Sequence, residues 1–234
     1  MQRLDKTLSH ELGITRSEAA SALRRGEVSV NGTVVKKGDV KIDPECDEIL
    51  FCGRKILCSE FIYIMMNKPA GVLSVSRDNS RPTAIDLIDK KYRKRRLFPA
   101  GRLDKDSTGF LLITDDGDLA HRMLSPKSHV EKTYIVTTDA LPENAEAAFK
   151  NGIILTSGEL CMSADYSQIT TSPPTAKIIL KQGKYHQIKR MLGTLNVGVC
   201  SLHRISIGKV SLDEKLKPGE YRLMSPDEVL KLTI

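Results

Sequence analysis

The order of strand-like and helix-like segments after residue 60 limits the possible folds more than any other feature of the sequence. Short apolar runs typical of strands occur at residues 61–66, 110–114, 132–137, 175–181 and 199–207. Helical patterns occur near residue 119, at 142–150 and 188–195, and after Ser225-Pro226, which together have the form of a helix start. These segments do not follow a repeated strand–helix–strand rhythm. They predict an α+β domain around a mixed, largely antiparallel sheet.

The beginning of the chain has a different pattern. Leucines four positions apart at residues 4–12 give one apolar stripe on a helix, which Gly13 ends. Thr15 and Glu18 have the spacing of a capping box, which starts a second helix. Alternating apolar residues on both sides of Asn31-Gly32 then predict a hairpin. We therefore expect a small module at residues 1–58, a junction at 53–60 and a larger domain at 59–234.

Composition and charge narrow the class of protein. The chain is 40% apolar, and it has no run near the roughly 18 apolar residues that span a bilayer. It begins without the apolar core of a signal peptide, so we expect a cytoplasmic protein that does not contact a membrane. Its five cysteines lack zinc-site spacing, which indicates free thiols and no metal. The net charge of +7 suits a polyanionic partner, although a merely solvated basic surface would explain it too.

An acid in a tight turn is the feature that most favours chemistry. Asp104 lies between Gly101 and Gly109, directly before the apolar run at residues 110–114. Such a turn can hold one short carboxylate at a fixed angle in a cleft. However, an acid in a glycine-containing turn is more often only a turn former, so the residues alone leave both interpretations open.

The residues around this acid resemble a known family. The stretch G-R-L-D-K-D-S-T-G-F-L-L at residues 101–112 is similar to the catalytic motif of pseudouridine synthases, in the branch typified by RsuA. Residues 67–71 (N-K-P-A-G), 131–134 (E-K-T-Y) and 185–191 (Y-H-Q-I-K-R-M) resemble three further motifs of that branch, in the same order. Ser107 and Phe110 depart from the commonest residues, but neither departure affects a catalytic role.

Residues 17–43, S-E-A-A-S-A-L-R-R-G-E-V-S-V-N-G-T-V-V-K-K-G-D-V-K-I-D, resemble the S4 RNA-binding domain, in which paired helices and a hairpin grip structured RNA. Residues 90–96 add six cations in seven positions. Phosphates would relieve the mutual repulsion of these charges. The expected RNA-binding residues are Arg3, Arg16, Arg24, Arg25, Lys36, Lys37, Lys90, Lys91, Arg93, Lys94, Arg95 and Arg96.

The resemblance implies that Asp104, Tyr134 and Lys189 are catalytic. Asp104 would attack C1′ of a uridine or remove a ribose proton to give a glycal, and sequence does not separate these routes. Lys189 would offset the cost of burying that carboxylate. Tyr134 would pack against the base and assist proton removal from C5. The reaction involves no redox change and gains no atom, so we expect no cofactor and no metal.

The family motifs also imply residues that bind the substrate. Arg102 would fill the space that a flipped uridine leaves in the RNA. Ile188 would form an apolar wall against the base. His186 and Arg190 would contact phosphate or support the loop, and Lys68 of the first motif completes the expected substrate-binding set.

The expected function is thus uridine isomerisation in ribosomal RNA. The compact length of the chain and its lack of a long basic tail favour the 16S RNA of the small subunit as substrate. We expect an assembly intermediate of that subunit as the partner and a monomeric enzyme. Three alternatives remain. They are a large-subunit (23S) enzyme of the same branch, an RNA-binding assembly factor without turnover, and a glycosidase-like hydrolase using Asp104 and Asp106. We expect two acids this close on an extended turn to point to different sides, which argues against the hydrolase.

Overall fold

The computed structural model describes residues 1–43, 46–56, 61–93, 95–125 and 128–233, and they form two compact units. Unit 1 comprises Met1–Ile62 and Asp89–Arg96, and unit 2 comprises Tyr63–Ile88 and Leu97–Ile234. The basic segment at residues 89–96 groups with unit 1, although the sequence suggested a place in the larger domain. The expected boundary between residues 58 and 59 falls outside the described residues and stays a prediction.

Unit 1 contains two helices followed by short strands. Its elements are β1 (Gln2–Arg3), α1 (Leu4–Leu12), α2 (Arg16–Arg24), β2 (Val28–Val30), β3 (Thr33–Val34), β4 (Lys41–Ile42), β5 (Ile49–Phe51), β6 (Arg54–Ile56) and α3 (Lys90–Arg93). The strand order is β3-β2-β5-β6, and β1 pairs separately with β4. Residues 90–93, at the start of the basic run, form the short helix α3.

The helix cap and the hairpin turn of unit 1 form as the sequence predicts. The Thr15 hydroxyl accepts a hydrogen bond from the Glu18 backbone N–H, and the Glu18 carboxylate accepts one from the Thr15 backbone N–H, which caps α2. Asn31 and Gly32 both have positive φ angles, as a two-residue hairpin turn between β2 and β3 requires. The leucines of α1 pack with Leu23 and Ile49 in a core of the unit's own.

Unit 2 is built on a nine-stranded sheet. Its elements are β7 (Tyr63–Lys68), the 3₁₀ helix η1 (Ala84–Leu87), β8 (Phe98–Pro99), β9 (Thr108–Thr114), α4 (Gly117–Leu124), β10 (Lys132–Thr138), α5 (Ala145–Asn151), β11 (Asp165–Thr171), β12 (Pro174–Leu180), α6 (Gln187–Thr194), β13 (Val199–Ile207), β14 (Val210–Ser211), β15 (Tyr221–Leu223) and α7 (Pro226–Lys231). β8, β11, β14 and β15 were not expected from the sequence.

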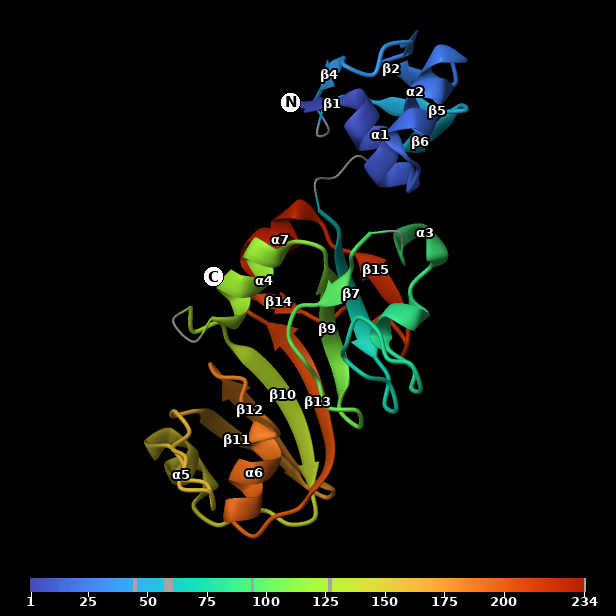
Figure 1. Ribbon diagram of the computed structural model, residues 1–234. Helices are drawn as coiled ribbons and strands as arrows, with labels where there is room; N and C mark the ends of the chain where they lie inside the picture. Colours follow the sequence, from blue (N-terminus) through green and yellow to red (C-terminus); the bar gives the residue numbers. More distant parts are fainter. Residues whose placement is uncertain (44–45, 57–60, 94, 126–127, 234) are drawn as a thin grey trace. The chain divides into compact units, whose positions relative to one another are not determined.

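The sheet order explains how distant parts of the sequence meet. It runs β11-β12-β10-β13-β9-β7-β15, with β14 on β13 and β8 on β9. Every pair is antiparallel except β13 with β9, which is parallel, so the expected α+β fold with a largely antiparallel sheet is confirmed. Helices α5 and α6 lie beside β10–β12, whereas α4 and α7 lie toward the opposite end of the unit (Figure 1).

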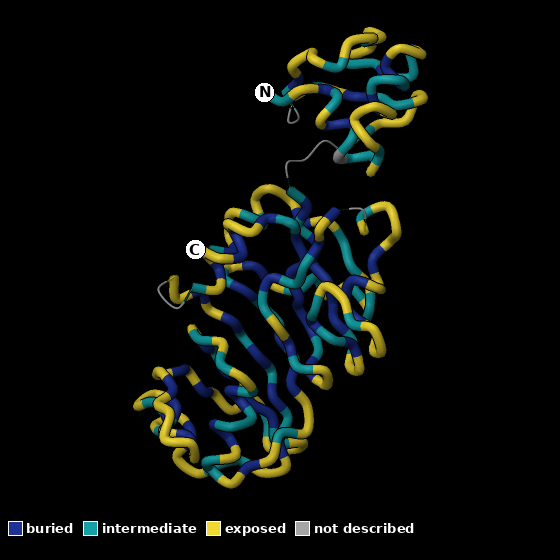
Figure 2. The backbone as a smooth tube through the Cα atoms, in the orientation of Figure 1, coloured by how far each residue is buried: buried dark blue, intermediate teal, exposed yellow. Residues whose placement is uncertain are grey.

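The middle of this sheet is the most buried part of unit 2. The tube of Figure 2 is continuously buried along much of β7 and β9. Met65, Phe110 and Leu112 of these strands pack against Leu119 and Met123 of α4. Residues attached to this buried centre are therefore held rigidly. None of the helices among the described residues is long and apolar enough to cross a membrane.

Candidate active site

Asp104 lies on a turn between β8 and β9, directly before the buried centre of the sheet. The two glycines that bound the turn, Gly101 and Gly109, have φ angles of 95° and 100°, which side-chain-bearing residues rarely adopt. Gly109 also faces Arg204 across the parallel β9–β13 pair. A Cβ atom at residue 109 would overlap the Arg204 carbonyl oxygen and lie 2.7 Å from its backbone nitrogen. Glycine is thus required here by both conformation and space.

Replacing this glycine should destabilise unit 2. We expect Gly109→Ala to lower the free energy of unfolding by roughly 2–4 kcal/mol, because the methyl group must push β9 away from β13. Gly117→Ala is the matched control, since a Cβ there meets no atom within 4 Å and φ is ordinary. Denaturant unfolding of both variants measures the difference. Equal stability of the two would contradict the close approach at residue 109.

A buried lysine holds the turn through hydrogen bonds to its backbone. Lys68, at the end of β7, is fully buried, and its ammonium donates to the carbonyl oxygens of Ser107 at 2.8 Å, Pro69 at 3.0 Å and Asp104 at 3.1 Å. Burial lowers the pKa of Lys68 to about 8. The Ser74 hydroxyl adds hydrogen bonds to the backbone of Leu103. In this structure the ammonium binds the turn itself, and a contact of Lys68 with substrate stays a prediction.

The side chain of Asp104 faces Lys189 and His186 near the start of α6. One carboxylate oxygen lies 3.5 Å from the Lys189 ammonium, and the other lies 3.4 Å from Nε2 of His186. His186, the residue before α6, has a left-handed φ of 48°, so its backbone is not helical and its side chain does not continue the helix. The Asp104 side chain is 24% exposed, so it is partly desolvated and still reachable. A carboxylate in this position can act as a nucleophile or a base.

Asp106 shares the same lysine, which corrects one expectation from the sequence. Both of its carboxylate oxygens lie 2.7 Å from the Lys189 ammonium, closer than Asp104. Asp104 and Asp106 therefore converge on one cation instead of pointing to different sides. The hydrogen bond from Lys189 lowers the pKa of Asp106. The side chain of Asp106 is 73% exposed, so it lies at the rim of the site, where its carboxylate holds the Lys189 ammonium.

Tyr134 and Arg204 face each other across β10 and β13, next to the base of the turn. Tyr134 is buried, and its hydroxyl accepts a hydrogen bond of 3.4 Å from Nη1 of Arg204. Nε of Arg204 donates to the Phe110 carbonyl at 2.7 Å, and its Nη2 has no partner among the described residues. Arg204 thus ties Tyr134 to the strand that follows the turn. Arg204 was not among the residues predicted from the sequence, because its contacts depend on the pairing of β13 with β10 and β9.

The remaining predicted site residues differ in burial and in the groups that they contact. Arg102 is exposed at the turn and Ile188 is buried on α6. The Arg190 guanidinium, expected to bind phosphate or support the loop, contacts Glu159 at 3.2 Å and Ser157 at 2.8 Å. These contacts join α6 to the segment at residues 157–159, and a further contact with the Tyr185 carbonyl at 3.5 Å supports the loop before α6.

The predicted RNA-binding cations of unit 1 are mostly exposed. Arg3 and Arg25 form surface ion pairs with Asp5 and Glu27. Arg95 differs from the others, since its side chain is 3% exposed and pairs with Glu11 at 3.1 Å. Lys94 lies outside the described residues. The exposed members are Arg3, Arg16, Arg24, Arg25, Lys36, Lys37, Lys90, Lys91, Arg93 and Arg96.

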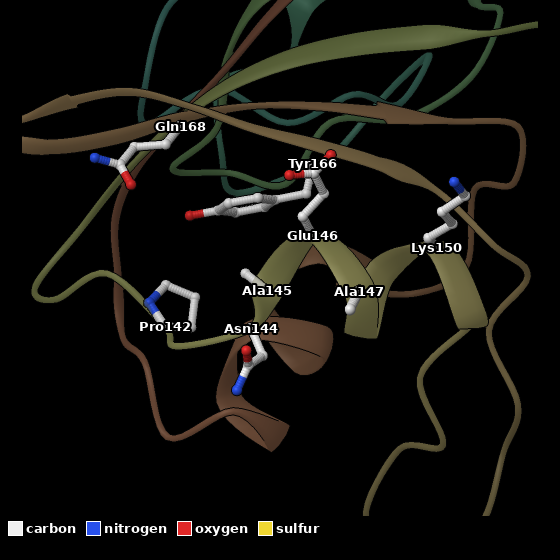
Figure 3. A pocket seen from close by; sticks show the side chains of 8 residues that line it. All are labelled: Pro142, Asn144, Ala145, Glu146, Ala147, Lys150, Tyr166 and Gln168. Atoms are coloured by element: carbon white, nitrogen blue, oxygen red, sulfur yellow. The ribbon is translucent and has the colours of Figure 1, made fainter.

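A hollow of about 530 Å³ lies elsewhere, between α5 and β11 (Figure 3). Its lining includes Asn144, Glu146, Lys150, Tyr166 and Gln168. None of these residues belongs to the four motifs that surround Asp104. The hollow is therefore separate from the residues that the sequence predicts to be catalytic.

Comparison with known proteins identifies the family of the chain. The sequence profile of the family described as RNA pseudouridylate synthase matches residues 62–194, which contain all four motifs, and that of the S4 domain matches residues 2–49. The chain therefore belongs to the RNA pseudouridylate synthase family, whose members are isomerases.

Individual relatives span nearly the full chain. It is 42% identical over 232 residues to the ribosomal small subunit pseudouridine synthase A of Haemophilus influenzae, covering 98% of this chain and 99% of that protein. It is 39% identical to an uncharacterized RNA pseudouridine synthase of Bacillus subtilis, with 97% and 96% covered. A crystal structure titled as a pseudouridylate synthase is 41% identical, has a TM-score of 0.70, and matches over 99% of this chain and 100% of that one.

Proposed function

We propose that this chain converts a specific uridine of 16S ribosomal RNA to pseudouridine, with Asp104 as the reacting carboxylate. The observation that carries the proposal is the position of Asp104, on a turn fixed by Lys68 and in contact with Lys189 and His186. Relatives named as small-subunit enzymes support the choice of RNA. The reaction breaks the bond between C1′ and N1, joins C1′ to C5, and transfers a hydrogen from C5 to N1, so the product is an isomer.

The proposed roles follow from the contacts. Asp104 attacks C1′ or removes a ribose proton, and both routes need its carboxylate ionised. Lys189 and His186 stabilise that charge in a partly desolvated site. Tyr134, held by Arg204, packs against the base with Ile188 on the other side and assists proton removal from C5. Arg102, exposed beside Asp104, takes the place of the everted uridine, whose flipping costs a few kcal/mol of stacking.

Unit 1 supplies the second part of the proposal. Its S4-like fold and exposed cations, including Arg16, Arg24 and Lys36, grip RNA structure near the target. We propose that the substrate is an assembling small subunit and that the enzyme acts as a monomer. The cytoplasmic location expected from the sequence stays a prediction.

Pseudouridine mapping at nucleotide resolution tests this function. Cells that lack the chain should lose a pseudouridine from 16S RNA, and the purified chain should restore it on unmodified 16S RNA but not on 23S RNA. A site lost from 23S RNA instead would favour the large-subunit alternative. Unchanged maps together with retained RNA binding would favour an assembly factor without turnover, and release of free uracil would indicate a hydrolase.

A further inference from the structure

Tyr185 is a large aromatic residue that unit 2 leaves in solvent beside the candidate active site. It is 72% exposed, although it directly precedes His186 and α6. Its ring stacks on the His186 ring, with centroids 3.8 Å apart and an interplanar angle of 17°. A nearly parallel aromatic pair with one highly exposed member has the form of an unfinished stack, which a further flat ring can extend.

The chain around Tyr185 is held in place by its neighbours. The Lys184 ammonium donates to the Leu160 carbonyl at 2.7 Å and pairs with Glu159 at 3.0 Å. Arg190 pairs with the same glutamate and also reaches the Tyr185 carbonyl at 3.5 Å. These contacts fasten the loop before α6 on both sides of the ring. The exposure of Tyr185 is therefore fixed by structure, so little order is lost when a ligand stacks on it.

The stack begins at the reacting carboxylate. Asp104 contacts Nε2 of His186, and the opposite side of the pair is Tyr185. The everted uridine is assigned to Asp104, Tyr134 and Ile188, so it does not need Tyr185. Its neighbours in the RNA must pass close to this loop, and their bases lose a stacking partner when the uridine leaves. Aromatic side chains are the usual supports for such unstacked bases.

We propose that Tyr185 is a stacking site for the base of a nucleotide adjacent to the target uridine. This inference rests on the proposed function and deepens it, because it names a second RNA base that the site recognises. Stacking is tolerant of base identity, so the site fixes the path of the RNA more than its sequence. The His186 ring then links two events, since it contacts Asp104 and supports the platform on which the flanking base rests.

The first test is a series at residue 185. Tyr185→Ala should raise the Kd for a short RNA that contains the target by roughly 5- to 150-fold, the range for loss of one base–aromatic stack. Tyr185→Phe and Tyr185→Trp should stay near wild type, because the ring is retained. Ile169→Ala, at another exposed apolar residue in unit 2, is the matched control and should have no effect. Wild-type affinity of Tyr185→Ala would overturn the inference.

A double-mutant cycle that combines Tyr185→Ala with abasic RNA identifies the partner base. Removing the flanking base that stacks on Tyr185 should weaken binding to the wild-type chain, but should cost nothing further in Tyr185→Ala. Independent effects at both flanking positions would overturn the inference while leaving the proposed function intact. A defect seen only with assembled particles, and not with naked RNA, would assign Tyr185 to a protein contact instead. Absence of pseudouridine from every ribosomal RNA offered to the wild type would overturn the proposed function itself.

Discussion

Asp104→Asn is expected to abolish pseudouridine formation while RNA binding stays near that of the wild type. The amide has nearly the same size as the carboxylate and leaves the turn intact, since Lys68 contacts backbone carbonyls and not this side chain. It cannot attack C1′ or accept a ribose proton as a carboxylate does. We expect the single-turnover rate to fall by at least about 10⁴-fold, the scale for loss of a reacting group.

Asp106→Asn is the matched control for this experiment. Asp106 is two positions away on the same turn, is 73% exposed and contacts only the shared lysine among the groups described above. Its loss should cost a small part of the rate, through looser placement of Lys189. Quantified pseudouridine from both variants, together with Kd values for RNA, gives the comparison. A similar rate for the two asparagine variants would contradict the assignment of Asp104.

Lys189→Met is expected to give the second-largest loss. The substitution removes the ammonium that both Asp104 and Asp106 contact. The side chains of Asp104 and Lys189 are each about a quarter exposed, so water compensates only part of the lost interaction. Removing one partner of a buried ion pair costs about 3–5 kcal/mol, and the partial exposure of this pair reduces that cost. If most of that cost falls on the reacting state, the single-turnover rate should drop by roughly 10²- to 10³-fold.

Lys189→Arg distinguishes charge from shape at this position. Arginine keeps the positive charge and can pair with both acids, so most of the rate should remain. In Lys189→Met the pKa of Asp106 should rise toward its ordinary value, because the hydrogen bond from Lys189 is the main cause of its lowering. NMR titration measures that shift. An unchanged Asp106 titration, or full activity of the methionine variant, would contradict the contact.

Features with a local cause were predictable from the sequence. The capping box of Thr15 and Glu18, the turn at Asn31 and the helix start at Ser225 depend on residues within a few positions of each other, and all three were found. The candidate site was predictable in a different way. Only its resemblance to a family brought Asp104 and Lys189 together, because nothing in their spacing indicates contact across 85 positions of sequence.

Features that depend on tertiary pairing were missed or misjudged. Arg204 reaches Phe110 across 94 positions because β13 lies beside β9, and no local pattern predicts that parallel pair. The burial of Lys68 depends on the turn that folds over its ammonium, which no local pattern around residue 68 indicates. The basic run at residues 90–96 indicated a surface cation at Arg95, but its side chain is buried in unit 1, where it pairs with Glu11.

The pairing of β13 with β9 has a consequence for protein synthesis. A ribosome produces unit 1, which has its own core, by the time residue 96 has been added. Arg204 and the strand that carries it are made about a hundred residues later, and until then Tyr134 lacks its guanidinium partner and Gly109 its parallel neighbour. Domains generally fold in the order in which they emerge. A nascent chain therefore gains its grip on RNA well before it gains the means to alter a base.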